Sequence, residues 1–208
     1  MRYYIESDGR VFLVRRDERL DLPFPSEISF AVERIAPLAG TEDVWFCVPM
    51  LDRHPTEWPC KDELALLATT DLARIAVHAT MPRVVVEGVC IRDGEVLVVK
   101  GSRGLTEGRW SLPGGFLRFG ETPAEGVLRE IQEEVGLVGA IEEAPVFRSK
   151  IGEESRLHWI MIFYRVAVDG VPIPSPDEIA EARFVEPKAA SEMLDATLGS
   201  VVLELADR

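Results

Sequence analysis

Residues 115–137 read GFLRFGETPAEGVLREIQEEVGL, and this stretch carries start and stop signals for one helix. Thr122 occupies the N-cap position, a proline takes the first helical position, and Glu125 can complete a capping box. Gly136 stands where a C-terminal cap is expected, because glycine accepts the left-handed conformation without strain. The stretch therefore predicts a helix over Pro123–Val135.

The predicted helix has two distinct faces at about 100° per residue. Glu130, Glu133 and Glu134 share one face, at the spacing i, i+3 and i+4. The apolar residues share another face: Ala124, Leu128, Ile131 and Val135. Three neighbouring carboxylates repel one another, and a hard divalent cation such as Mg²⁺ or Mn²⁺ offsets that repulsion. A solvated acidic face is the alternative, because the chain is rich in glutamate.

The spacing of nine residues in this stretch resembles the complete signature of the Nudix hydrolases, the Nudix box. The nine are Gly115, Glu121, Arg129, Glu130, Ile131, Glu133, Glu134, Gly136 and Leu137. Ordinary residue frequencies give such a match a chance on the order of 10⁻⁹ per starting position. The approach Trp110–Gly115 and the later stretch Asp177–Phe184 also resemble the family. The resemblance covers residues 82–190 and does not identify a subfamily.

The resemblance implies a site in which carboxylates hold divalent metal. The implied metal ligands are Glu130, Glu133, Glu134 and the carbonyl oxygen of Gly114. The implied reaction is attack of water on a phosphorus of a nucleoside diphosphate that is linked to another group. The physical logic agrees, because a bound metal neutralises the pyrophosphate and lowers the pKa of a bound water. The expected cofactor is Mg²⁺ or Mn²⁺.

Other box residues have implied roles around that centre. Arg129 is expected to act in catalysis as an orienting partner for Glu121 or Glu133, and a plain surface salt bridge is the alternative. Glu121 precedes the helix N-cap, where the helix dipole favours a negative charge. Together with Gly115 and Gly136, Glu121 is expected to support the site structurally.

A glutamate is the expected general base. In some members of the family this base belongs to the box and in others to a later loop, so Glu133 and Glu178 are the two candidates here. Glu178 follows the proline-rich segment 172–176. Arg103 and Arg109 flank the approach to the paired glycines and could bind substrate phosphate. For Glu178 and both arginines, solvated surface charge is the alternative.

The composition limits the possible partners. The 208 residues include 36 acidic and 23 basic ones, which gives a net charge of −13 and disfavours binding to nucleic acid or anionic membrane. No apolar run approaches the roughly 18 residues that a membrane span needs. Three scattered cysteines fit neither a disulfide framework nor a zinc site, so a cytoplasmic location is expected. A small nucleoside diphosphate derivative stays a suitable partner, because divalent metal reverses the local sign of charge.

The elements outside the box predict an α/β protein with two regions. Residues 81–208 are expected to form a Nudix-type mixed β-sheet sandwiched between helices. Residues 1–80 match nothing that we can name and are expected to form a smaller α+β region. This region is predicted to contain a strand over Val11–Arg15 and a helix over Asp62–Ala79. It is expected to serve homodimerisation or to form a wall of the substrate pocket, where Trp58 could stack on a base.

The box fixes the reaction class and leaves the linked group open. The chain lacks the four-cysteine zinc site usual in NADH-type pyrophosphatases and the extended motifs of that class and of the coenzyme A class. The proline that many ADP-ribose enzymes carry downstream of the box is absent, although the surrounding pattern resembles general ADP-ribose and sugar-nucleotide hydrolases. Those substrates are the first expectation. A nucleoside triphosphate pyrophosphohydrolase and a nucleotide-sensing Nudix-like module with little catalysis are the alternatives, and the intact box favours catalysis.

Overall fold

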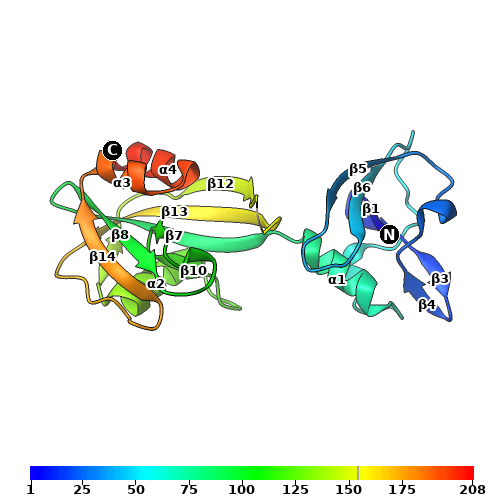
Figure 1. Ribbon diagram of the computed structural model, residues 1–208, viewed down its shortest axis with the longest axis horizontal. Coiled ribbons are helices and arrows are strands. Elements are labelled where there is room, and N and C mark those ends of the chain that lie inside the picture. Colours follow the sequence, from blue (N-terminus) through cyan, green and yellow to red (C-terminus); the bar gives the residue numbers. More distant parts are fainter. Residues whose placement is uncertain (154) are drawn as a thin grey trace. The chain divides into compact units, whose positions relative to one another are not determined.

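The computed structural model describes residues 1–153 and 155–208, and the chain divides into two units (Figure 1). The N-terminal unit consists of Met1–Pro82 together with Ile151–His158. The second unit consists of Arg83–Lys150 and Trp159–Arg208. The two regions were expected to meet near residue 80, and the sequence did not predict that the segment Ile151–His158 groups with the N-terminal unit.

The second unit is built on an eight-stranded mixed sheet. Its main path runs β11-β13-β7-β8-β14, and β10, β12 and β9 pair with β7, β13 and β8 respectively. Strand β7 pairs in parallel with β13 and antiparallel with β8 and β10, which makes the sheet mixed. The strands are β7 (Arg83–Arg92), β8 (Glu95–Gly101), β9 (Trp110–Ser111), β10 (Gly114–Phe116), β11 (Gly139–Ile141), β12 (Val146–Ile151), β13 (His158–Val168) and β14 (Ile179–Val185).

Helices cover both faces of this sheet (Figure 1). Helix α2 (Pro123–Val135) packs on one face, and α3 (Pro187–Met193) and α4 (Ala196–Ala206) pack on the other. Alternation along β7 serves both cores: Val86 and Cys90 face α2, whereas Val85 and Val89 face α3 and α4. The predicted α/β fold, a mixed sheet between helices, is confirmed. No helix in the described part of the chain is long and apolar enough to cross a membrane.

Helix α2 begins and ends as its sequence predicts. The Thr122 side chain accepts a hydrogen bond from the Glu125 backbone N–H, and the Glu125 side chain accepts one from the Thr122 backbone N–H. Gly136 ends the helix in the left-handed conformation with φ of 68°. The apolar stripe is shifted from the prediction, because Val127 is fully buried while Leu128 is only partly buried.

The N-terminal unit is α+β, as expected. A four-stranded sheet has the order β2-β1-β6-β5, and a separate two-stranded sheet pairs β3 with β4. The strands are β1 (Arg2–Ser7), β2 (Arg10–Phe12), β3 (Val14–Arg16), β4 (Arg19–Asp21), β5 (Val32–Pro37) and β6 (Val44–Pro49), and the helix is α1 (Asp71–Thr80). Short 3₁₀ turns lie at Pro25–Glu27, Lys61–Glu63 and, in the second unit, Gly104–Thr106.

Two predicted elements of this unit are wrong in extent. The helix expected over Asp62–Ala79 begins only at Asp71, because Thr70 caps it by accepting a hydrogen bond from the Ala73 backbone N–H at 3.3 Å. The preceding Thr69 instead forms an isolated bridge with Leu20 of strand β4. The single strand expected over Val11–Arg15 is divided between β2 and β3, which belong to different sheets.

Candidate active site

Strand β10 brings two glycines against carboxylate side chains. Gly114 pairs with Glu87 of β7, and Gly115 pairs with Val86. A Cβ on Gly114 would lie 2.2 Å from the Val86 carbonyl oxygen and 2.7 Å from Glu87 Oε2. A Cβ on Gly115 would lie 2.7 Å from Glu130 Oε1. Gly114 therefore requires glycine, because a backbone atom blocks any Cβ there, whereas glycine at 115 lets the Glu130 carboxylate approach the backbone.

The Glu134 side chain is anchored to the backbone of strand β10. The Gly114 N–H donates a hydrogen bond to Glu134 Oε2 at 3.0 Å. The N–H and C=O of one strand residue point toward the same edge, so the Gly114 carbonyl faces the edge where Glu134 lies. Burial, reinforced by the charges of Glu130 and neighbouring glutamates, raises the pKa of Glu134 to about 8, against the lowering effect of the Gly114 N–H. The surroundings of Glu134 therefore disfavour its ionised form, and a cation bound beside it would favour that form.

Arg129 gathers three other box glutamates. Its Nε donates to Glu121 Oε1 at 2.7 Å, and its Nη1 lies 2.8 Å from Glu130 Oε1 and 3.0 Å from Glu133 Oε2. The guanidinium also donates to the Phe116 carbonyl at 3.0 Å. Arg129 therefore contacts both of the partners suggested by the sequence, and Glu130 as well.

Glu121 and Glu130 respond differently to that arginine. Hydrogen bonds from the Arg129 side chain and then from the Arg118 backbone lower the pKa of Glu121 to about 2. The Glu130 side chain is only 12% exposed, and its burial raises its pKa despite the opposing effect of Arg129. Glu121 is therefore ionised and supports Arg129, whereas burial makes the Glu130 carboxyl beside Gly115 harder to ionise.

Glu133 is held by two arginines. Arg118 Nη2 donates to both of its carboxylate oxygens, at 2.8 Å and 2.9 Å, and Arg129 adds a third contact. Burial acts to raise the pKa of Glu133, but the hydrogen bonds from Arg129 and Arg118 outweigh it and lower the pKa. Arg118 was missed in the sequence reading, because it occupies a position that the box leaves unspecified.

The donor set suits a hard cation, although its members are not yet gathered. Among the described residues, no group of three or more acidic, histidine or cysteine side chains is already placed to hold a metal ion. Binding of a metal through Glu133 would compete with the hydrogen bonds that Glu133 accepts from Arg118. Carboxylate and carbonyl oxygens are nevertheless the donors that Mg²⁺ and Mn²⁺ prefer, and the glycines at 114 and 115 leave room for them.

A further acid, Glu87, lies beside Gly114. Its Oε2 is buried and has no hydrogen-bond partner among the described residues. Burial, followed by the charge of Glu134, raises the pKa of Glu87 well above its ordinary value. Glu87 was not predicted from the sequence, although it is a single acid inside the apolar run Val84–Ile91.

Beyond the box and Gly114, the predicted residues are Glu178, Arg103 and Arg109, and the first two lie near the box glutamates. Glu178 forms an ion pair with Arg103, and its charge raises the pKa of both Glu130 and Glu134, which places it close to the cluster. Arg109 is exposed in the turn before β9, where its backbone N–H donates to the Thr106 carbonyl at 2.9 Å.

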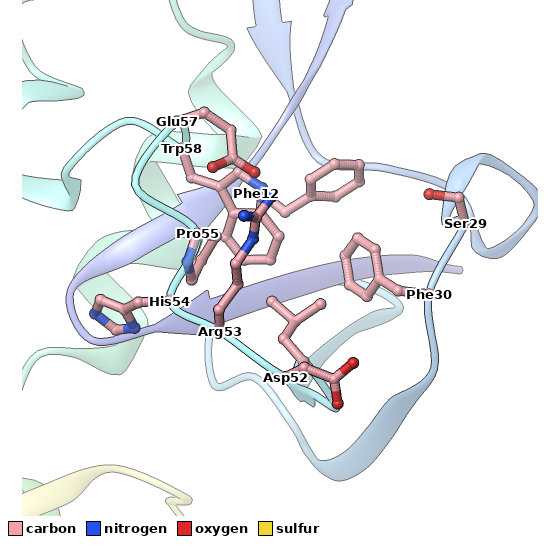
Figure 2. A pocket seen from close by; sticks show the side chains of 10 residues that line it. Phe12, Ser29, Phe30, Asp52, Arg53, His54, Pro55, Glu57 and Trp58 are labelled. Atoms are coloured by element: carbon pink, nitrogen blue, oxygen red, sulfur yellow. The ribbon is translucent and has the colours of Figure 1, made fainter.

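The N-terminal unit contains a separate hollow of about 530 Å³ (Figure 2). The packed rings of Phe12, Phe30 and Trp58 line it, with polar side chains such as Asp52 and His54 around them. Trp58 is only 8% exposed and belongs to a buried cluster of this unit. The carboxylate cluster lies in the second unit and does not line this hollow.

Comparison with known proteins agrees with the fold and the box. A family model described as NUDIX domain matches residues 81–205. An ADP-ribose pyrophosphatase of Methanocaldococcus jannaschii is 34% identical over 113 residues, which cover 54% of this chain and 65% of that protein. A MutT-like protein of Streptomyces ambofaciens is 44% identical over 70 residues, or 32% of this chain and 44% of that protein. The chain therefore spans less than two thirds of the length of either curated relative.

A solved structure shows the same architecture. The crystal structure of the MutT NUDIX hydrolase from Burkholderia pseudomallei superposes with a TM-score of 0.50 and 27% identity, covering 60% of this chain and 98% of that chain. The sheet between helices and the acidic helix beside paired glycines define a Nudix-type domain. The chain belongs to the Nudix family.

Proposed function

We propose that this chain hydrolyses the pyrophosphate bond of a nucleoside diphosphate linked to another group, with ADP-ribose or a sugar nucleotide as the first substrate to test. The observation that carries the proposal is the buried Glu134, whose carboxyl group accepts a hydrogen bond from the Gly114 N–H and has a raised pKa, with Glu130 nearby. The ADP-ribose pyrophosphatase among its relatives supports the choice of substrate.

The proposed metal ligands are Glu130, Glu133, Glu134 and the Gly114 carbonyl, and Mg²⁺ or Mn²⁺ is the proposed ion. When bound, the metal would neutralise the pyrophosphate and lower the pKa of a water. The protein's own part is orientation: Glu121 fixes Arg129, and Arg129 holds Glu130 and Glu133. The net charge of −13 is compatible with an anionic substrate only at a site where a cation reverses the local sign.

Glu133 and Glu178 are the proposed candidates for the general base, and Arg129 for an orienting catalytic residue. Glu133 already bonds to two arginines, which disfavours proton abstraction while those bonds persist. Glu178 is partnered by one exposed arginine, Arg103. Arg103 and Arg109 are proposed to bind substrate phosphate, and Arg103 also contacts Glu178.

Replacing Glu178 by Gln tests the base assignment. If Glu178 abstracts the proton, kcat should fall by roughly 10²- to 10⁴-fold, because a general base contributes about that much, while KM changes little. Steady-state kinetics with Mg²⁺ would measure both constants. Glu181→Gln is the matched control, since Glu181 is a nearby exposed glutamate of β14 that faces Lys100. A wild-type kcat in Glu178→Gln would remove this residue from the mechanism.

Two alternatives remain as proposals of lower rank. A nucleotide-sensing module with little catalysis is favoured only by the two arginines that hold Glu133. A nucleoside triphosphate pyrophosphohydrolase would share the site and differ in product. A panel of ADP-ribose, sugar nucleotides, dinucleoside polyphosphates and nucleoside triphosphates separates them: release of a nucleoside monophosphate from diphosphate derivatives supports our proposal, and tight binding without turnover supports the sensing module.

We also propose a homodimer located in the cytoplasm. Strand β5 is an edge of the N-terminal sheet and exposes Ile35, and the neighbouring β6 exposes Val48, so this edge could pair with a second copy. The three cysteines are free, in keeping with a reducing compartment. Light scattering of the intact protein measures its mass directly, and a monomeric mass would contradict the homodimer. Full hydrolytic activity of that monomer would show that activity does not depend on dimerisation.

A further inference from the structure

Glu87 is the only acid in β7, a strand whose other central residues are buried and apolar or glycine. A carboxyl group in such a place is retained at a cost unless something binds it. Its Oε2 atom has no hydrogen-bond partner within the described residues. Packing alone therefore gives no reason for an acid at this position.

The position of Glu87 connects it with the candidate metal site. Glu87 pairs with Gly114, and its Oε2 occupies the space next to Gly114 where a Cβ would lie, at 2.7 Å. The backbone N–H of the same Gly114 binds Glu134. The carboxyl groups of Glu87 and Glu134 thus border one residue, whose carbonyl faces the edge where Glu134 lies.

A protein cation does not account for Glu87. The charge of Lys150 acts to lower the pKa of Glu87, but Lys150 Nζ is already 2.7 Å from Asp195 Oδ2. Asp195 acts on Glu87 with the opposite sign and so opposes the effect of Lys150. The described neighbourhood therefore gathers the carboxyl groups of Glu87, Glu130 and Glu134 around Gly114 and its neighbour, and a bound cation would favour their ionised forms.

We infer that Glu87 is a fourth carboxylate of the divalent-cation site. It is a positioning residue that strengthens cation binding from its place beside Gly114. The inference rests on the proposed function, because it assumes that a cation binds at Glu130, Glu134 and the Gly114 carbonyl. In a poorly solvated environment, the attraction between a cation and a nearby carboxylate is weakly screened. Glu87 touches no reacting atom and acts by holding the cation.

Manganese titration of the intact protein tests this role without reference to turnover. Calorimetry should show Mn²⁺ binding to the wild type, and Glu87→Gln should raise the Kd about 10-fold, the scale of an outer-sphere contribution. The control Glu181→Gln, an exposed glutamate of the same sheet, should leave the Kd unchanged. An unchanged Kd in Glu87→Gln would overturn the inference alone. A wild-type protein that binds no Mn²⁺ would overturn the proposed function and this inference with it.

Thermal unfolding supplies the second measurement. Without metal, Glu87→Gln should melt no lower than the wild type, because it replaces a buried acid whose Oε2 has no hydrogen-bond partner among the described residues; with Mn²⁺, its rise in Tm should be smaller. A lower metal-free Tm with an intact Mn²⁺ response would identify Glu87 as structural and overturn the inference. If Glu87→Gln does not fold, Glu87→Ala repeats the test with a smaller side chain, and failure of both to fold would also count against it.

Discussion

Replacing Glu134 by Gln is expected to lower kcat for pyrophosphate hydrolysis by about 10²- to 10³-fold, the scale on which enzymes lose rate when one stabilising group is removed. The amide keeps the size of the side chain, and its oxygen can still accept the hydrogen bond from the Gly114 N–H. What it removes is the negative charge that, in our proposal, binds the metal. The fold should therefore survive while Mg²⁺-dependent turnover is lost.

The control for this variant lies on the same helix. Glu125→Gln changes a glutamate in the first turn of α2, where glutamine also completes a capping box. Its turnover and melting temperature should stay close to those of the wild type. Undiminished turnover in Glu134→Gln, measured with Mg²⁺ at saturating substrate, would contradict the assignment of Glu134 as a metal ligand.

The paired glycines should respond differently to alanine. In Gly114→Ala, the new Cβ would meet the Val86 carbonyl oxygen at 2.2 Å, a backbone atom that cannot rotate away. The strand must shift, and a loss of about 1–3 kcal/mol or more in unfolding free energy is expected. In Gly115→Ala, all three nearest atoms belong to the carboxylate end of Glu130, which can move. That variant should fold well and lose turnover, because Glu130 is displaced.

Urea unfolding and hydrolysis assays, run on both glycine variants, separate stability from chemistry. The account predicts a large loss of stability for Gly114→Ala and a large loss of turnover with little loss of stability for Gly115→Ala. Equal stability of the two variants would contradict the packing described around β10. Full turnover and unchanged Mn²⁺ affinity in Gly115→Ala would contradict the role proposed for Glu130.

Helix α2 was predictable because its signals are local. The Thr122 cap, the capping-box Glu125 and the left-handed Gly136 act within a turn or two of the chain. Local signals also explain why the start of α1 was predicted wrongly. The apolar spacing extends back through Leu67 and Leu64, but Thr69 forms a bridge with Leu20 that interrupts the helix. A contact between segments so far apart leaves no periodic signal.

The site was predictable in its box and not in its surroundings. Glu130, Glu133 and Glu134 were apparent from the helix face, whereas Glu87 comes near them only because β7 pairs with β10. Arg118 reaches Glu133 through the conformation of the loop that precedes α2. Such partners depend on strand pairing and loop conformation, which the spacing within one motif does not encode.

The edge strand β5 was missed for a related reason. Val32–Pro37 includes a glutamate and an arginine in succession, and most of its residues are partly or fully exposed. An edge strand with neither face deeply buried lacks the alternation of apolar and polar residues that marks strands in a sequence. Its pairing with β6 is set by the sheet and not by its own pattern.

The most direct test of the central claim is product release from ADP-ribose by the purified chain with and without divalent metal, followed by chromatography. With Mg²⁺ or Mn²⁺, the account predicts AMP and ribose 5-phosphate; with a chelator, or with metal in the Glu134→Gln variant, it predicts almost none. A sugar nucleotide assayed in parallel decides which linked group is preferred. Hydrolysis that persists undiminished in the chelator, or no cleavage of any nucleoside diphosphate derivative with either metal, would contradict the account.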